Sequence, residues 1–295
     1  SGHSLAMMAA SAPLAPCANL SHQQRGLASI AAIKLLDDSL QDDGVLADLA
    51  KRLETMHQKL VNSPRRFLLV AEVEHKQKLI TQLETLWSDA QADAAATFSL
   101  APTRETVKQL WVTNTAVSFC AKAYATVSVD HVDAAPLSVL GDFLRNGYLH
   151  RAIREQGGAY GVGAGQDNGD AIFRFFSYRD PRIEETLQDF DAAVNWLLET
   201  EHDEGKLSEA ILGVVSSIDK PASPAGEAKQ AYHSQLFGRS AEQRKAFRAK
   251  ILQVNITDLQ RVAKRYLQPE NASIAVVTNA ELAEPLAQDY ELINL

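Results

Sequence analysis

Apolar side chains recur at intervals of three and four residues over much of this chain. Between Leu46 and Leu60 they fall on one face of a helix, which we expect to end near Pro64, and a second helical stripe runs through Leu79 and Leu83 to Trp87. The same spacing predicts further helices at 137–148, 183–197, 206–219 and 257–267. Two cap signals support this interpretation: Asp180 and Pro181 precede the helix at 183, and 257–260 has the form of a capping box.

Other segments carry the patterns of strands. Residues 66–73 and 273–278 are short apolar runs suited to buried strands, and 159–165 and 171–178 predict a hairpin. In 117–129 the apolar residues occupy odd numbers, so we predict a long strand with one face in the core. Residues 4–18, interrupted by two prolines, are interpreted as a strand leading into a loop.

The order of these elements indicates two units of one α+β fold. Residues 88–103 are rich in Ala, Ser, Thr and Asp without a sustained period, which favours a linker. On either side, the order of loop, helices, short apolar strand and helix in 13–86 is repeated in 221–286. We therefore predict mixed or antiparallel sheets packed with helices, in a duplicated unit whose first copy is truncated. The boundaries are 1–90, a linker at 91–103, and a complete unit at 104–295.

Composition and charge narrow the classes of partner. The net charge is −8 and no basic cluster is longer than Arg65–Arg66, so we predict no nucleic-acid partner. No apolar run approaches the roughly 20 residues needed to cross a bilayer, so we predict no membrane partner. Cys17 and Cys120 are distant in sequence and lack metal or redox spacing, which predicts reduced packing residues and a cytoplasmic location.

The densest chemical signal is the run from Ile153 to Gly165, where a helix carrying Arg154 leads into five glycines interleaved with Tyr160. One interpretation is a helix cap followed by a strand of small residues that admits a close backbone. A phosphate-binding loop is the other, although neither a G-x-G-x-x-G register nor a Walker pattern fits. Arg154 and Tyr160 flank the turn, where a guanidinium and a phenol could both hydrogen-bond a peptide carbonyl or carboxylate.

The segment IREQGGAYGVGAG at 153–165 resembles the Arg-Glu-Lys-Gly-Gly-Ala-Tyr-Gly run in the C-terminal half of presequence proteases, in the pitrilysin/insulinase group of metallopeptidases, and only Gln156 departs from it. The likeness extends from GHSLAMMAASAPLAP and LSHQQRGLASI to the closing SIAVVTN. It implies the fold of a metallopeptidase half. Residues 1–90 would end the third of four α+β domains, and 104–295 would form the fourth.

The resemblance also implies a function. The parent protein would be a zinc-dependent endopeptidase of unstructured oligopeptides, and this chain its substrate-binding, chamber-closing half. Its partners would be the N-terminal catalytic half of the same polypeptide and peptide substrates. Arg154 and Tyr160 match the family residues that reach the substrate or the tetrahedral intermediate, and Gly157, Gly158 and Gly161 would shape the loop.

The zinc motif of this group, H-x-x-E-H, fits none of the eight histidines, so we expect zinc only in the missing N-terminal half and no cleavage by this chain alone. Two alternatives stay open. The chain could be a non-enzymatic scaffold or partner subunit of the same fold, or a nucleotide-binding protein that uses the glycine run.

Overall fold

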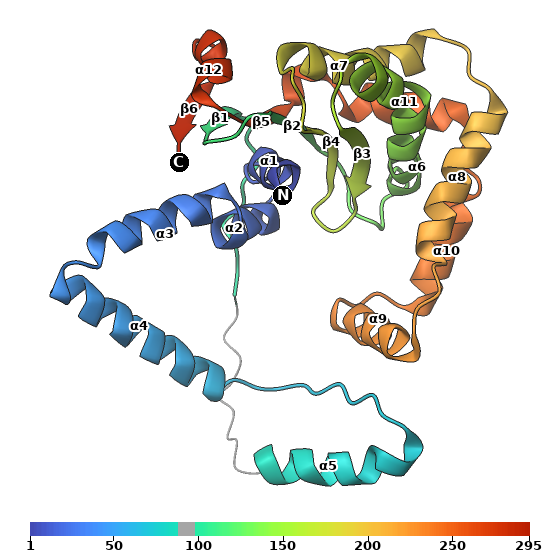
Figure 1. Ribbon diagram of the computed structural model, residues 1–295. Coiled ribbons are helices and arrows are strands. Elements are labelled where there is room, and N and C mark those ends of the chain that lie inside the picture. Colours follow the sequence, from blue (N-terminus) through green and yellow to red (C-terminus); the bar gives the residue numbers. More distant parts are fainter. Residues whose placement is uncertain (88–97) are drawn as a thin grey trace. The chain divides into compact units, whose positions relative to one another are not determined.

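The computed structural model describes residues 1–87 and 98–295 (Figure 1). Contacts within the chain divide it into two units. The first unit comprises 1–33, 100–220 and 244–295, and the second comprises 34–99 and 221–243. These units are defined by which residues pack together. The predicted boundaries at 90 and 104 instead separate two domains of the same α+β fold, so the two divisions describe different things. Those boundaries stay a prediction, and most of the linker predicted at 91–103 lies outside the described residues.

The first unit contains one mixed sheet. Its strands are β1 (Lys108–Val112), β2 (Phe119–Ala125), β3 (Gly161–Asp167), β4 (Ile172–Tyr178), β5 (Ser273–Thr278) and β6 (Glu291–Asn294). Their order is β3-β4-β2-β5-β1-β6, with β1 parallel to both β5 and β6 and the other pairs antiparallel. The predicted hairpin and the predicted strand at 273–278 are confirmed, and the sheet with its helices confirms the α+β fold class.

Helices accompany these strands along the chain. Those that lie wholly in the first unit are α1 (Gly2–Ser11), α2 (Pro16–Arg25), α6 (Ala134–Leu144), the π-helix η1 (Arg145–Gln156), α7 (Glu184–Glu199), α8 (Glu204–Ile218), α11 (Ile256–Tyr266), η2 (Pro269–Asn271), α12 (Ala280–Ala283) and η3 (Glu284–Leu286). Two more, α3 (Leu27–Ser39) and α10 (Ala241–Ile251), have residues in both units. No helix within the described residues is long and apolar enough to cross a membrane.

The sheet is covered on both faces. On one face Ala121, Ala123 and Val277 pack with the alanines of α1. On the other, Tyr124 and Phe175 belong to a larger core built with α6, α7 and α11. The prediction that β2 has only one face in the core is therefore wrong, because both sets of alternating side chains meet a helical layer.

The prediction of a strand leading into a loop at 4–18 is also wrong, because α1 and α2 occupy this segment. Alanine and methionine are strong helix formers, and Ala6, Ala9 and Ala10 are fully or almost fully buried along one side of α1. Their small side chains let the helix backbone lie close to the sheet. Pro16 is accommodated at the first turn of α2, where no intrahelical amide bond is lost.

In the second unit, α4 (Asp43–Val61) and α5 (Val73–Trp87) confirm the two helices predicted there, and α9 (Pro224–Leu236) adds a third. The strand predicted at 66–73 is absent: residues 66–72 have no regular secondary structure, and within the described chain no neighbouring strand pairs with them. A strand needs a hydrogen-bonded neighbour, so a strand-like sequence alone does not form one. The repeat of element order between 13–86 and 221–286 fails at this position.

Smaller expectations need correction as well. Asp180 does not cap a helix directly, because α7 starts later and the buried Asp180 carboxylate accepts hydrogen bonds from the Arg182 amide and the Thr186 hydroxyl. The capping box of α11 is formed by Asn255 and Asp258, rather than beginning at residue 257. Cys120 is buried as predicted, whereas Cys17 is exposed and is not a packing residue.

Candidate functional site

The π-helix η1 carries Arg154 to the surface. Leu149 and Ile153 are completely buried in the larger core and fix the rotation of this helix, so the next residue, Arg154, is exposed. Extended π-helical geometry is rare and frequently occurs at functional sites. Here the packing of two apolar side chains aims one guanidinium at solvent.

Two glycines end η1 and reverse the chain. Gly158 has a φ of +80°, a left-handed conformation that favours glycine, and its amide donates to the Arg154 carbonyl over 3.3 Å. The Ala159 amide donates to the Ile153 carbonyl over 3.1 Å. At Gly157 an added Cβ would meet the Arg182 guanidinium. Both glycines are therefore required by this turn.

Tyr160 follows the turn and is 61% exposed. Its amide donates to the Arg179 carbonyl over 3.3 Å, which fixes the backbone at the start of β3. Its ring centroid lies 5.5 Å from that of Tyr178, and the Arg179 guanidinium lies 5.6 Å from the Tyr160 ring. The ring is thus held from one side while much of the side chain is open to a partner.

The glycines of β3 have a packing role. An added Cβ at Gly161 would strike the Tyr178 ring, and one at Gly163 would strike the Phe176 ring. His3 of α1 stacks beside the same two aromatic rings, with its centroid 4.9 Å from Tyr178 and 5.4 Å from Phe176. Glycine is needed here because aromatic side chains lie over the strand. This packing explains the glycine run, and no phosphate-binding loop has to be invoked.

Sequence reasoning missed the two arginines behind this turn. Arg179 has a φ of +51°, unusual for a residue other than glycine, and contacts Tyr160 through its carbonyl and its guanidinium. Arg182 fills the space beside Gly157 and donates to the Asp189 carboxylate over 2.9 Å. The register of the hairpin could have indicated them, since Tyr178 pairs with Gly161 and the chain then continues past the glycine turn.

Among the described residues, the histidines and cysteines that could bind a metal or act as nucleophiles do not come together in a second site. The described residues include no group of three or more His, Cys, Asp or Glu side chains placed to hold a metal. His150 pairs with Glu155 over 3.2 Å, and the ring of His202 bonds the Leu197 carbonyl. Burial raises the pKa of the Cys120 thiol far above its usual value, which leaves it a poor nucleophile.

Comparison with known proteins identifies a consistent group. The family model described as PreP C-terminal domain matches residues 108–280. A mitochondrial presequence protease of Yarrowia lipolytica is 32% identical over 284 residues, covering 94% of this chain and 28% of the relative. One of Drosophila melanogaster is 30% identical, covering 92% of this chain and 26% of that protein. The chain thus spans about a quarter of the length of these relatives.

Solved structures share the fold at low sequence identity. A protease from Helicobacter pylori aligns with a TM-score of 0.54 and 15% identity, over 68% of this chain and 52% of that one. A peptidase M16 inactive domain from Pseudomonas fluorescens aligns with a TM-score of 0.50 and 13% identity, over 69% and 51%. These similarities establish the architecture.

The expected cytoplasmic location is wrong. The relatives from Yarrowia lipolytica, Drosophila melanogaster and Mus musculus are all named as mitochondrial proteins. Two reduced cysteines are compatible with more than one reducing compartment, so cysteine usage could not distinguish between them.

Proposed function

The chain belongs to the PreP C-terminal domain family, and on that premise we propose that it is the substrate-binding, chamber-closing half of a zinc-dependent endopeptidase that degrades unstructured oligopeptides. The relatives' names support a presequence protease as the parent enzyme and a mitochondrial location for it. The N-terminal half of the same polypeptide would supply the catalytic centre.

One observation carries the proposal: Arg154 and Tyr160 are both exposed at either end of a turn whose backbone is fixed on both sides. A guanidinium offers five N–H donors and a phenol one O–H donor. Pre-placed donors of this kind stabilise the negative charge that develops on a peptide carbonyl during cleavage. The two residues would therefore bind the substrate and support its transition state, while Gly157, Gly158 and Gly161 keep the turn in shape.

The described residues of this chain offer no binding site for the zinc ion of the proposed enzyme. The sequence contains no H-x-x-E-H, and the described residues present no cluster of metal ligands. Zinc would be held by the N-terminal half, where it would activate a water molecule. The contribution of this chain is to bind and orient the peptide.

The second unit supports the proposed N-terminal partner. On α4 the apolar side chains Leu53, Met56 and Leu60 are 52–72% exposed, and none of the residues of α4 is buried. Exposed apolar faces of this kind mark interaction surfaces. We propose that residues 1–90 complete the third domain with polypeptide from the N-terminal half, and that 104–295 form the fourth.

The test is peptide hydrolysis by the full-length protein loaded with zinc. Replacing Arg154 by Ala should lower kcat/KM by about 100-fold, the usual cost of losing one donor to a developing oxyanion. Tyr160→Phe, which removes only the hydroxyl, should lower it by about tenfold. Thermal unfolding and zinc content should stay unchanged in both variants.

Arg151→Ala is the matched control, because Arg151 is another exposed arginine on η1. Its kcat/KM should equal that of the wild type. Equal activity of the Arg154→Ala variant and the wild-type protein would show that the turn does not contribute to the catalytic chamber. A zinc-loaded wild-type protein that hydrolyses no peptide would instead favour the scaffold function.

A further inference from the structure

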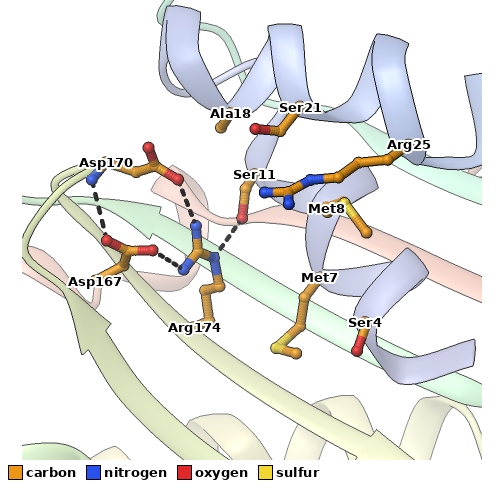
Figure 2. Close-up of a pocket in the computed structure, with 10 residues that line it drawn as sticks. All are labelled: Ser4, Met7, Met8, Ser11, Ala18, Ser21, Arg25, Asp167, Asp170 and Arg174. Carbon is orange, nitrogen blue, oxygen red and sulfur yellow. Dashed lines mark hydrogen bonds and ion pairs between the residues drawn. The ribbon is translucent and has the colours of Figure 1, made fainter. Parts of the chain in front are cut away.

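A pocket of about 310 Å³ lies within the first unit, between α1, α2 and the turn that joins β3 to β4 (Figure 2). It is lined by Ser4, Met7, Met8, Ser11, Ala18, Ser21, Arg25, Asp167, Asp170 and Arg174. Its size lies at the lower end of the range for small-molecule sites, roughly 300–1,000 Å³. Apolar and charged side chains share its wall.

Hydrogen bonds from Arg174 to three side chains fix one side of the pocket. Its Nε donates to the Ser11 hydroxyl over 2.7 Å, one Nη to Asp167 over 2.8 Å and the other to Asp170 over 3.1 Å. Asp167 also accepts the amides of Gly169 and Asp170 through its second oxygen. Burial acts to raise the pKa of Asp167. The charge of Arg174 and the hydrogen bonds that Asp167 accepts outweigh this effect and lower the pKa, so the carboxylate stays ionised.

The pocket wall carries two charges that are not fully neutralised, a negative one at Asp167 and Asp170 and a positive one at Arg25. Two carboxylates share one guanidinium, which leaves a net negative charge, and the described residues make no hydrogen bond to Oδ1 of Asp170. Arg25 extends from the last turn of α2 over Met8 towards Ser11, as Figure 2 shows. Its guanidinium has no carboxylate partner in the part of the chain that the structure describes.

An anionic and a cationic group thus face one small space whose remaining wall includes two methionine side chains. Methionine is flexible and polarisable, and it adapts to apolar groups of different shapes. A ligand that complements all three features carries an ammonium, a carboxylate and an apolar side chain. Free amino acids and dipeptides have this combination at neutral pH.

We propose that this pocket binds a small zwitterionic peptide, with its ammonium on Asp170, its carboxylate on Arg25 and its apolar side chain against Met7 and Met8. The site goes beyond the proposed function and does not depend on it. Asp170 and Arg154 lie beyond opposite ends of the β3–β4 hairpin, and strands of this length span about 20 Å. Ligands of this class are the chemical products of peptide hydrolysis.

The experiment uses the 295-residue chain labelled with ¹³C at its methionine methyl groups. The chain has three methionines, of which Met7 and Met8 line the pocket and Met56 lies on α4, so Met56 serves as an internal reference. The probe is the dipeptide Ala-Leu at about pH 6.5, below the pKa of its amine, roughly 8. Saturable shifts of Met7 and Met8 with an unmoved Met56 are expected.

Two blocked probes and two variants test each charge. N-acetyl-Ala-Leu lacks the ammonium and Ala-Leu-amide lacks the carboxylate, and each should bind at least about tenfold more weakly, as expected for a lost charged hydrogen bond. Arg25→Gln and Asp170→Asn should have the same effect on Ala-Leu. Arg52→Gln, on the exposed surface of α4, should bind like the wild type.

Shifts of equal size with the blocked probes would overturn the proposal, since apolar contact alone would then explain them. An absence of shifts at Met7 and Met8 would overturn it too, because the dipeptide would then not enter the pocket. Because the blocked probes act on the unaltered chain, the result does not depend on whether the variants fold. Because peptide hydrolysis is not measured, failure here leaves the proposed function untouched.

Discussion

Gly158 decides how the chain passes from Arg154 to Tyr160. Its φ of +80° lies where side chains other than glycine rarely occur, and Pro181 lies within 3.6 Å of an added Cβ. The neighbouring Gly165 has no atom within 4 Å of an added Cβ and no positive φ. Position 158 therefore requires glycine, whereas position 165 does not.

We therefore expect Gly158→Ala to lower the free energy of unfolding by about 1–2 kcal/mol through backbone strain. Urea denaturation of the isolated chain measures it. Gly165→Ala is the matched control and should be neutral or slightly stabilising, since alanine reduces the entropy of the unfolded chain. Equal stabilities of the two variants would contradict the role given to the left-handed turn.

Asp133 is a buried residue with a structural role. It is completely buried at the start of α6, where it accepts hydrogen bonds from Tyr266 over 2.7 Å and from Arg261 and Arg265 of α11. Burial alone would raise its pKa, but the hydrogen bonds from Tyr266 and Arg261 outweigh that effect and lower it. Burial and the Asp133 charge raise the pKa of Tyr266 to about 12, which keeps its phenol a donor.

A carboxylate whose pKa is lower in the folded protein stabilises the fold above its unfolded pKa, about 3.9 for Asp. That contribution is lost as the pH falls through the lower, folded pKa. Asp133→Asn should therefore destabilise the protein by about 1–3 kcal/mol at pH 7, and the difference from wild type should shrink below roughly pH 4. Urea midpoints across pH measure this, with the exposed Asp130→Asn as a neutral control.

At the scale of elements, β2 lies in the interior of the sheet with both faces covered. Lys122 has an even number, and the predicted strand at 117–129 puts even-numbered residues on the face away from the core, yet the Lys122 side chain is only 4% exposed. Its Nζ lies 2.6 and 2.7 Å from the two oxygens of Asp191 on α7, and it also donates to the Leu187 carbonyl. Burial lowers the pKa of Lys122, against the opposing effect of Asp191.

The pair predicts a non-additive result. Asp191→Ala should cost about 3 kcal/mol, because it leaves a buried ammonium without its partner. Lys122→Met combined with Asp191→Ala should cost less than Asp191→Ala alone, since the uncompensated charge is then removed. Chemical denaturation of the single and double variants provides the cycle. Strictly additive losses would show that the two side chains do not stabilise each other.

For the molecule as a whole, the segment 66–72 stands out because it is strand-like in sequence but pairs with no strand among the described residues. Phe67, Leu68 and Val70 are 40–49% exposed, and the amides of 67–71 make no backbone hydrogen bond to the described residues. Unbonded amides exchange their hydrogens readily. We propose that this segment, which has no pairing strand among the described residues, pairs with a strand of the N-terminal half in the full-length protein.

Hydrogen exchange followed by mass spectrometry tests this. In the isolated chain the amides of 67–71 should exchange within the shortest labelling time, and in the full-length protein they should be protected at least about tenfold. β5 is the internal control, because it is paired on both sides and should be protected in both samples. Strong protection of 67–71 in the isolated chain would contradict the proposal.

Local pattern determined much of this protein. The helices α4, α7 and α8, the hairpin β3–β4 and the strand β5 follow from periodicity, because the spacing that buries one face of an element is written in consecutive residues. The turn that exposes Arg154 and Tyr160 was found in the same way, since glycine marks a local backbone requirement. Their function stays a proposal.

Only the tertiary structure decided the remainder. It placed β5 between β1 and β2, made α1 a helix against Ala121 and Ala123, buried Lys122 against Asp191, and left 66–72 without a pairing strand among the described residues. It also gathered Arg25, Asp170 and two methionines around one pocket. Sheet pairing and charge pairing join residues far apart in sequence, and their free energy depends on neighbours that no local pattern names.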